Sequence, residues 1–133
     1  MKDKMNKSTP DAVAPLLSVA DLSIWIDTPK GMVRPVDSVS FSLASGRTLG
    51  IVGESGCGKS MLCRALIRLL PAGGHITRKA KVCFNGVDLA ALSEKSLCRI
   101  RGRDVAMVFQ NPMTALNPVM RVGKQIGENL RLH

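Results

Sequence analysis

The stretch Gly53-Glu54-Ser55-Gly56-Cys57-Gly58-Lys59-Ser60 follows directly on an apolar run, Leu49-Gly50-Ile51-Val52. A short, continuous apolar run that ends at turn residues is typical of a strand buried on both faces. After the glycines, apolar residues recur at the spacing of one helix face: Leu62, Ala65, Leu66 and Leu69. The chain therefore predicts a strand, a glycine-rich loop and a helix, in that order, with the helix ending near Pro71.

The glycine-rich stretch, called the phosphate loop (residues 53–60) below, matches G-x-x-x-x-G-K-[ST] in the setting that this motif requires. Glycines let backbone N–H groups turn inward, where they and the helix amino end can hold β- and γ-phosphates. Lys59 would bridge the same phosphates and the Ser60 hydroxyl would ligate Mg²⁺. An ordinary glycine turn is the alternative, but the flanking pattern favours a nucleotide. The residues expected to contact it are Gly53, Glu54, Ser55, Gly56, Cys57, Gly58, Lys59, Ser60 and Met61.

The composition favours anionic partners without choosing among them. Nineteen Lys and Arg residues against ten Asp and Glu give the 133-residue chain a net charge of +9. One Trp, three Phe and no Tyr offer few platforms on which single-stranded bases could stack. A nucleic-acid-binding module, motivated by Arg99, Arg101 and Arg103, is therefore a minor alternative, and a solvent-exposed helix end is the preferred interpretation of those arginines.

The cysteines and the amino terminus indicate a reducing compartment. The four cysteines form neither the close pairs of a zinc site nor part of a secreted pattern. The amino-terminal residues lack the apolar stretch of a secretion signal, and no run approaches the ~20 apolar residues of a membrane span. Any membrane association is expected to occur through a partner.

The first half of the folded region predicts antiparallel sheet. Residues 1–15 read as a disordered lead-in, because charge and proline leave no periodic apolar face. Residues 17–26 nearly alternate, with one slip at Ala20-Asp21 that predicts a bulge. A turn at residues 28–31 and clean alternation over residues 39–43 complete a hairpin.

The second half predicts mixed elements. Residues 81–84 followed by Asn85-Gly86 indicate a strand and tight turn, and Ser93 is placed to cap a helix that runs through Ile100. Residues 105–109 are expected to form a buried strand and residues 122–132 a helix. Since the chain stops inside that last pattern, part of the fold is expected to be missing.

Two blocks together carry a family resemblance. The phosphate loop with its preceding apolar run, and the later block Val108-Phe109-Gln110-Asn111-Pro112-Met113-Thr114-Ala115-Leu116-Asn117-Pro118, resemble the ATP-binding subunits of ATP-binding cassette (ABC) transporters. The second block is most similar to the branch that serves bacterial dipeptide, oligopeptide, glutathione and nickel importers. The resemblance implies an α/β P-loop NTPase fold of the ABC ATPase type: an amino-terminal antiparallel β subdomain plus the first part of the parallel core, incomplete. Its implied domain division is a lead-in over 1–15 and a partial ATP-binding domain over 16–133.

The resemblance also assigns roles to single residues. Gln110 matches the family's Q-loop glutamine, which positions Mg²⁺ and the attacking water, and residues 111–118 would be a docking loop for the membrane partner or, alternatively, a rigid surface loop. Ile26 stands where the family has an aromatic residue that stacks on adenine, so Ile26 offers only apolar contact. Trp25 faces the other side of the strand if the strand alternates. The implied cofactors are ATP and Mg²⁺.

The implied setting is the cytoplasmic face of a bacterial inner membrane. The expected partners are transmembrane permease subunits, a second ATP-binding subunit in a homo- or heterodimer, and indirectly a solute-binding protein. The family's signature segment, its strand ending in Asp-Glu and its switch histidine are not found after Gln110. The complete form is therefore expected to be a transport-coupled ATPase, and the alternative is a truncated fragment that binds nucleotide passively and cannot hydrolyse it.

Overall fold

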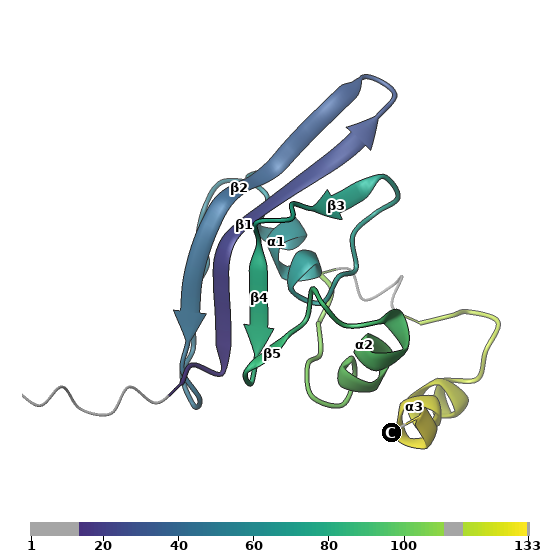
Figure 1. The fold of residues 1–133 in the computed structure, drawn as a ribbon. Helices are drawn as coiled ribbons and strands as arrows, with labels where there is room; N and C mark the ends of the chain where they lie inside the picture. The colour runs from purple at the N-terminus through teal and green to yellow at the C-terminus, as the bar shows by residue number, and fades with distance from the viewer. Residues whose placement is uncertain (1–13, 111–115, 133) are drawn as a thin grey trace, which may run out of the picture.

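The fold is an antiparallel sheet with helices on one side of it (Figure 1). The computed structural model describes residues 14–110 and 116–132, so the predicted lead-in falls almost entirely outside the described residues. In chain order the elements are β1 (Leu17–Thr28), β2 (Gly31–Leu43), α1 (Lys59–Leu66), β3 (Gly74–Ile76), β4 (Lys81–Phe84), β5 (Val87–Asp88), α2 (Glu94–Ile100) and α3 (Val122–Leu132).

Strand β1 is the centre of the sheet. It pairs with β2 along one edge, and along the other edge it pairs with β4 near its start and with β3 near its end. The order is β2-β1-β4-β5, with β3 beside β1, and every pairing is antiparallel. The predicted antiparallel front of the chain is confirmed.

The predicted bulge explains how β1 keeps one face apolar. The β1–β2 register shifts between Val19 and Leu22, and Asp21 adopts a left-handed φ of 51°. The Asp21 N–H leaves the ladder and donates to the Ser40 hydroxyl at 2.9 Å. One extra residue puts Val19 and Leu22 on the same face although three positions separate them, because side chains in a regular strand alternate.

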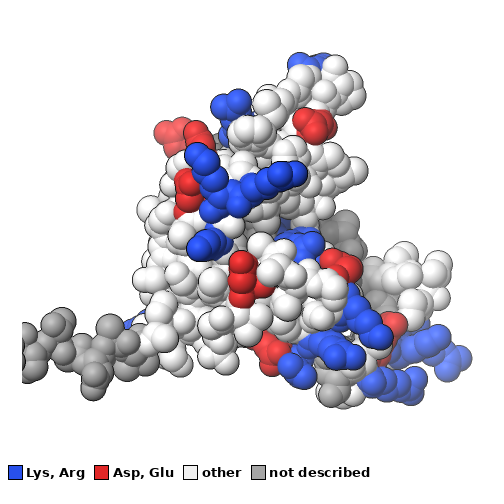
Figure 2. All heavy atoms as spheres, in the orientation of Figure 1, with Lys and Arg blue, Asp and Glu red and all other residues white. Residues whose placement is uncertain are grey.

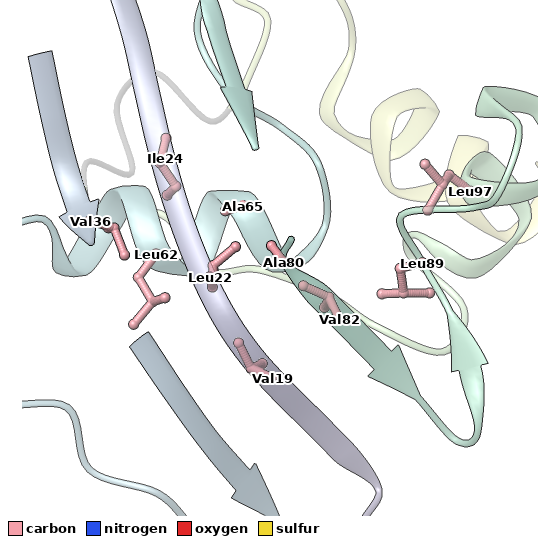
Figure 3. Packing of buried hydrophobic residues seen from close by; sticks show 10 residues of the cluster. All are labelled: Val19, Leu22, Ile24, Val36, Leu62, Ala65, Ala80, Val82, Leu89 and Leu97. Carbon is pink, nitrogen blue, oxygen red and sulfur yellow. The ribbon is translucent and has the colours of Figure 1, made fainter. Parts of the chain in front are cut away.

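The core lies between this face of the sheet and the helices (Figure 3). Leu22 and Ile24 of β1 are fully buried, and α1 packs Leu62 and Ala65 against them. Burial of a Leu or Ile side chain contributes about 1.5–3 kcal/mol. Strand β4, the segment after β5 and α2 extend the same cluster through Ala80, Val82, Leu89 and Leu97.

Several local predictions are confirmed. Thr28 pairs with Gly31 at the hairpin turn, and Asn85 and Gly86 take positive φ angles of 48° and 78°, as the tight turn between β4 and β5 requires. Ser93 caps α2 by accepting a hydrogen bond from the Ser96 N–H at 3.3 Å. Helix α3 has the bounds that the sequence predicts.

Two predicted strands are wrong. Residues 49–52 and 105–109 are irregular apart from a single bridge between Arg101 and Val105, and Val52 and Val108 are 93% and 96% exposed. Apolar sequence supplies side chains for burial, but a strand also needs a neighbouring backbone to hydrogen-bond with. None of the described strands pairs with either segment.

Two further differences concern the region between α1 and β4. Helix α1 ends at Leu66, earlier than predicted, and Leu69 is 41% exposed. The three-residue strand β3 lies between the predicted helix end near Pro71 and the predicted strand 81–84, where the sequence predicts no element. Within the described residues, no helix combines the length and the apolar character needed to cross a bilayer.

Candidate functional site

The phosphate loop is anchored where it enters α1. Gly58 is the N-cap of α1 in the left-handed region, with φ 97° and ψ 0°, and its carbonyl accepts from the Leu62 N–H at 2.8 Å. A Cβ atom on Gly58 would overlap the Pro35 carbonyl oxygen and lie 3.3 Å from Val36 Cγ2. Only glycine fits between the loop and β2, so this position fixes the loop against the sheet.

Lys59 closes the loop on itself. Its Nζ donates to the carbonyl oxygens of Gly53 at 2.7 Å and Glu54 at 2.5 Å, and it lies 3.4 Å from Cys57 Sγ. The ammonium group therefore stands over the loop backbone, where it is paired with neutral carbonyl groups. A phosphate oxygen is a stronger partner for an ammonium than a carbonyl oxygen is, because both groups are charged.

A hollow of about 260 Å³ lies beside this lysine. Its walls come from β2 through Val36 and Val39, from Ile51 and Val52, and from the end of the phosphate loop. Most of the lining is apolar, with Asp37 as the carboxylate and Lys59 as the ammonium among the described lining residues. Apolar walls next to an ammonium group suit a ligand with an apolar body and an anionic end.

Ile26 and Trp25 lie on opposite faces of β1, as the alternation predicts. Ile26 is partly buried against the core, and the residues that line the 260 Å³ hollow do not include it. The Trp25 ring has the Arg34 guanidinium 4.7 Å from its centroid and the His75 ring 6.1 Å away, edge to face. On the outer face, Trp25 therefore packs against Arg34 and His75.

Gln110 is exposed at the end of the described segment before residue 111. Its neighbour Phe109 has the Arg64 guanidinium 5.8 Å from its ring centroid, within cation–π range. Arg64 is one helical turn beyond Ser60 on α1, so the helix that begins at the phosphate loop also contacts the Gln110 segment. Among the described residues, no hydrogen bond joins Gln110 to Lys59 or Ser60.

The predicted docking loop, 111–118, is described only at its end, because residues 111–115 lie outside the described residues. There Gln125 of α3 binds the backbone of Asn117 on both sides: Oε1 accepts from the Asn117 N–H at 2.8 Å, and Nε2 donates to the Asn117 carbonyl at 2.9 Å. Sequence reasoning did not single out Gln125. A glutamine on a helix gives no signal of a backbone partner eight residues earlier.

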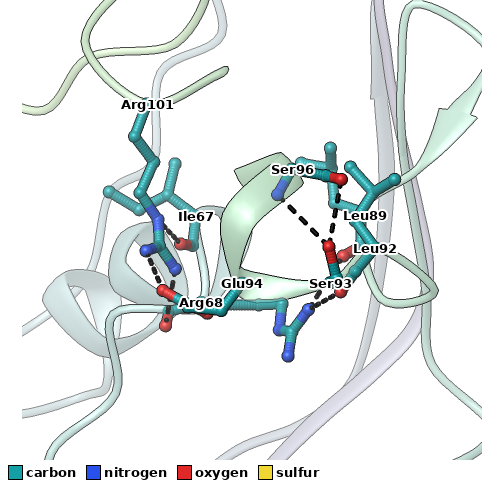
Figure 4. Close-up of polar contacts among 8 residues, drawn as sticks. All are labelled: Ile67, Arg68, Leu89, Leu92, Ser93, Glu94, Ser96 and Arg101. Carbon is teal, nitrogen blue, oxygen red and sulfur yellow. Dashed lines mark hydrogen bonds and ion pairs between the residues drawn. The ribbon is translucent and has the colours of Figure 1, made fainter. Parts of the chain in front are cut away.

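Arg101 corrects the interpretation of the arginine group as a solvent-exposed helix end. Its side chain is 17% exposed, Nε donates to the Ile67 carbonyl at 2.8 Å, and Nη2 donates to the Arg68 carbonyl at 3.2 Å (Figure 4). Nη1 forms an ion pair with Glu94. Arg101 therefore ties the carbonyls after α1 to α2 and to the start of the segment that carries Gln110.

Arg103 is also engaged within the chain. It forms an ion pair with Asp104 at 2.7 Å, and the hydrogen bond and negative charge of that carboxylate raise the pKa of Arg103. Figure 2 shows Lys and Arg side chains over the part of this face formed by α2 and α3, with acidic side chains among them. Such mixed charge is not the uninterrupted basic surface that a nucleic-acid backbone favours.

The side chains of the phosphate loop fit a magnesium nucleotide whose phosphates supply most of the metal ligands. Ser60 is an exposed residue in the first turn of α1, directly after Lys59. Within the described residues, no group of three or more His, Cys, Asp or Glu side chains could hold a metal ion. Mg²⁺ bound through one hydroxyl and substrate phosphates is a common arrangement.

An antiparallel front sheet packed on a glycine loop, with the loop lysine over its backbone and a helix starting at Lys59, defines the nucleotide-binding part of a P-loop NTPase. The chain belongs to the ABC transporter family, whose model matches residues 36–131.

The chain is similar to ATP-binding proteins of oligopeptide and dipeptide transport. The chain is 50% identical over 118 residues to the oligopeptide transport ATP-binding protein OppD of Escherichia coli (strain K12), covering 89% of this chain and 34% of that protein. It is 46% identical over 121 residues to OppD of Bacillus subtilis (strain 168), covering 91% and 34%. It is 46% identical over 118 residues to the dipeptide transport ATP-binding protein DppD of Bacillus subtilis (strain 168), covering 89% and 35%. The chain thus spans about a third of the length of the curated relatives it matches.

Proposed function

We propose that this chain forms the nucleotide-binding part of an energy-coupling ATP-binding subunit of an importer for peptides or a related small solute. The observation that carries the proposal is the phosphate loop itself, held against β2 at Gly58 and closed over by Lys59. The identity to oligopeptide and dipeptide transport ATP-binding proteins supports the transport role and the substrate class.

In this proposal MgATP binds through residues 53–61. The ATP phosphates replace the Gly53 and Glu54 carbonyls as partners of Lys59, and the backbone of Glu54, Ser55, Gly56, Cys57 and Gly58, together with the start of α1 at Ser60 and Met61, surrounds them. Ser60 and Gln110 are the proposed ligands of Mg²⁺. The apolar hollow beside Lys59 is placed to take the uncharged part of the nucleotide, with Ile26 contributing at most a distant apolar contact.

Hydrolysis and transport are proposed for the complete protein. There Gln110 would orient the attacking water, and Mg²⁺ would supply charge neutralisation at the transferred phosphate. The proposed partners are transmembrane permease subunits, a second ATP-binding subunit, and a solute-binding protein reached through the permease. The proposed location is peripheral, on the cytoplasmic face of the inner membrane.

Calorimetric titration with MgATP tests the proposal. Wild-type protein should bind, and Lys59→Ala should abolish binding, because the ammonium is the charged partner of the phosphates. Lys95→Ala is the matched control: it removes the same charge from an exposed position on α2 and should leave affinity within about twofold of wild type. Equal affinity in the Lys59 and Lys95 variants would contradict the assignment.

A further inference from the structure

A second hollow, away from the phosphate loop, lies between the end of α1, strand β3, the 77–80 turn and the segment after β5. It measures about 540 Å³, and we call it the basic hollow. Of the nine described residues that line it, Arg68, His75 and Arg78 are basic and none is acidic. We propose that the basic hollow binds a small soluble molecule that carries a phosphate group.

The charge of Arg68 supports an anionic ligand. Its Nη1 donates to the Leu92 carbonyl at 2.7 Å and to the Leu89 carbonyl at 3.4 Å, so the half-buried guanidinium is fixed by neutral groups (Figure 4). The ion pairs between described residues join Arg101 to Glu94 and Arg103 to Asp104, and Arg68 has no carboxylate partner among them. A partly desolvated guanidinium without a counter-charge favours an anion beside it.

The remaining lining specifies the ligand further. Arg78 is exposed at the rim, and Thr77 adds a hydroxyl group, so the polar side of the hollow offers guanidinium and hydroxyl donors. Such a set matches the several oxygens of a phosphate, which guanidinium groups bind in a bidentate manner. Leu70 and Ile76 provide an apolar side, and a volume of about 540 Å³ exceeds the need of a single phosphate ion.

The basic hollow has its own spectroscopic reporter. His75 lines the hollow, and its ring meets the Trp25 ring edge to face at 6.1 Å. Trp25 is the one tryptophan of this chain. A ligand bound beside β3 changes the surroundings of His75, whose ring contacts the indole, so Trp25 emission should respond to this site.

The test uses ribose 5-phosphate and inorganic phosphate as probes in a Lys59→Ala background, which removes the charged partner of phosphates in the phosphate loop. Ribose 5-phosphate should give a saturable change in Trp25 emission, confirmed by calorimetry, and should bind more tightly than inorganic phosphate because of the apolar side. Arg78→Gln should weaken binding at least tenfold. Lys79→Gln makes the same charge change at the next residue, which does not line the hollow, and should weaken binding less than twofold.

The outcomes separate this proposal from the assignment of the phosphate loop. No saturable binding of either probe, or equal weakening by Arg78→Gln and Lys79→Gln, would overturn the basic hollow as a site whatever the result with MgATP. Retained far-UV circular dichroism in both variants excludes loss of fold as the cause. If Arg78→Gln alters the fold, Thr77→Val with calorimetric detection supplies the same test, because it removes a hydroxyl donor from the lining: unchanged ribose 5-phosphate affinity would then refute the proposal.

Discussion

Replacement of Gly58 by alanine should destabilise the protein more than replacement of any open loop glycine. Gly58 has φ +97°, and an added Cβ would overlap the Pro35 carbonyl oxygen while lying 3.1 Å from the Pro35 carbonyl carbon. A left-handed conformation costs an alanine about 1–2 kcal/mol. Insertion of a methyl group against packed backbone adds about 1–3 kcal/mol, so the total loss in the free energy of unfolding is roughly 2–5 kcal/mol.

Gly56→Ala is the matched control, because Gly56 has φ +81° in the same loop and no heavy atom within 4 Å of the added Cβ. It should lose only the conformational part, about 1–2 kcal/mol. Urea unfolding followed by far-UV circular dichroism measures both variants, and equal m-values are required for the comparison. The reasoning fails if the two losses agree within about 0.5 kcal/mol, since the contact with β2 would then contribute nothing.

Three other perturbations test separate contacts. Arg101→Ala leaves the Ile67 and Arg68 carbonyls and Glu94 without their guanidinium partner, and it should reduce the free energy of unfolding by about 1–3 kcal/mol in urea titrations. Arg99→Ala, at an exposed position of α2, is the control and should change the free energy of unfolding by less than about 0.5 kcal/mol. Equal effects of the two variants would contradict a stabilising role for the Arg101 contacts. Ser93→Ala removes the N-cap of α2 and should cost about 1 kcal/mol by the same measurement, whereas an unchanged midpoint would show that the cap is dispensable. Alkylation of Cys57, whose sulfur lies 3.4 Å from Lys59 Nζ, should block MgATP binding in calorimetric titrations, and full modification with unimpaired binding would exclude that effect.

Local patterns predicted much of the fold, because their causes lie within a few residues. The slip at Ala20-Asp21 marks a bulge because an extra residue is the only way to keep a strand face apolar across it. Asn85-Gly86 marks a tight turn because both residues tolerate positive φ, and Ser93 marks a helix start because its hydroxyl can accept a free backbone N–H. The glycines of the phosphate loop likewise mark positive φ angles and the start of the helix that follows, because those features depend on the local backbone.

Contacts between distant residues carry no such local signal. Arg101 reaches the Ile67 carbonyl across 34 positions of sequence, and an arginine near a helix end looks the same whether it meets solvent or a carbonyl. Strand β3 is three residues long and exists because β1 offers it a free edge. Residues 49–52 show the opposite case. Their apolar pattern is typical of a buried strand, but no described strand pairs with them, so the pattern alone predicted a strand that does not form.

The candidate site is held in place by contacts on one side of the phosphate loop. Residues 49–52, before the loop, are exposed, whereas Gly58, at its end, is packed against β2. Val52 is 93% exposed and forms no strand, yet the loop that follows it ends in a cap that admits only glycine against β2. Beyond the cap, α1 buries Leu62 and Ala65 in the core, and the carbonyls that follow the helix are bound by Arg101. The position of Lys59 therefore depends on contacts that follow it in the chain: the packing of α1 against the antiparallel sheet, and the hydrogen bonds from Arg101 to the carbonyls after α1. Arg101 is also the first residue of the segment that ends at Gln110. Because α1 joins these contacts, a substitution at either end of α1 should shift the phosphate loop. Substitutions confined to residues 49–52 should change the position of Lys59 less.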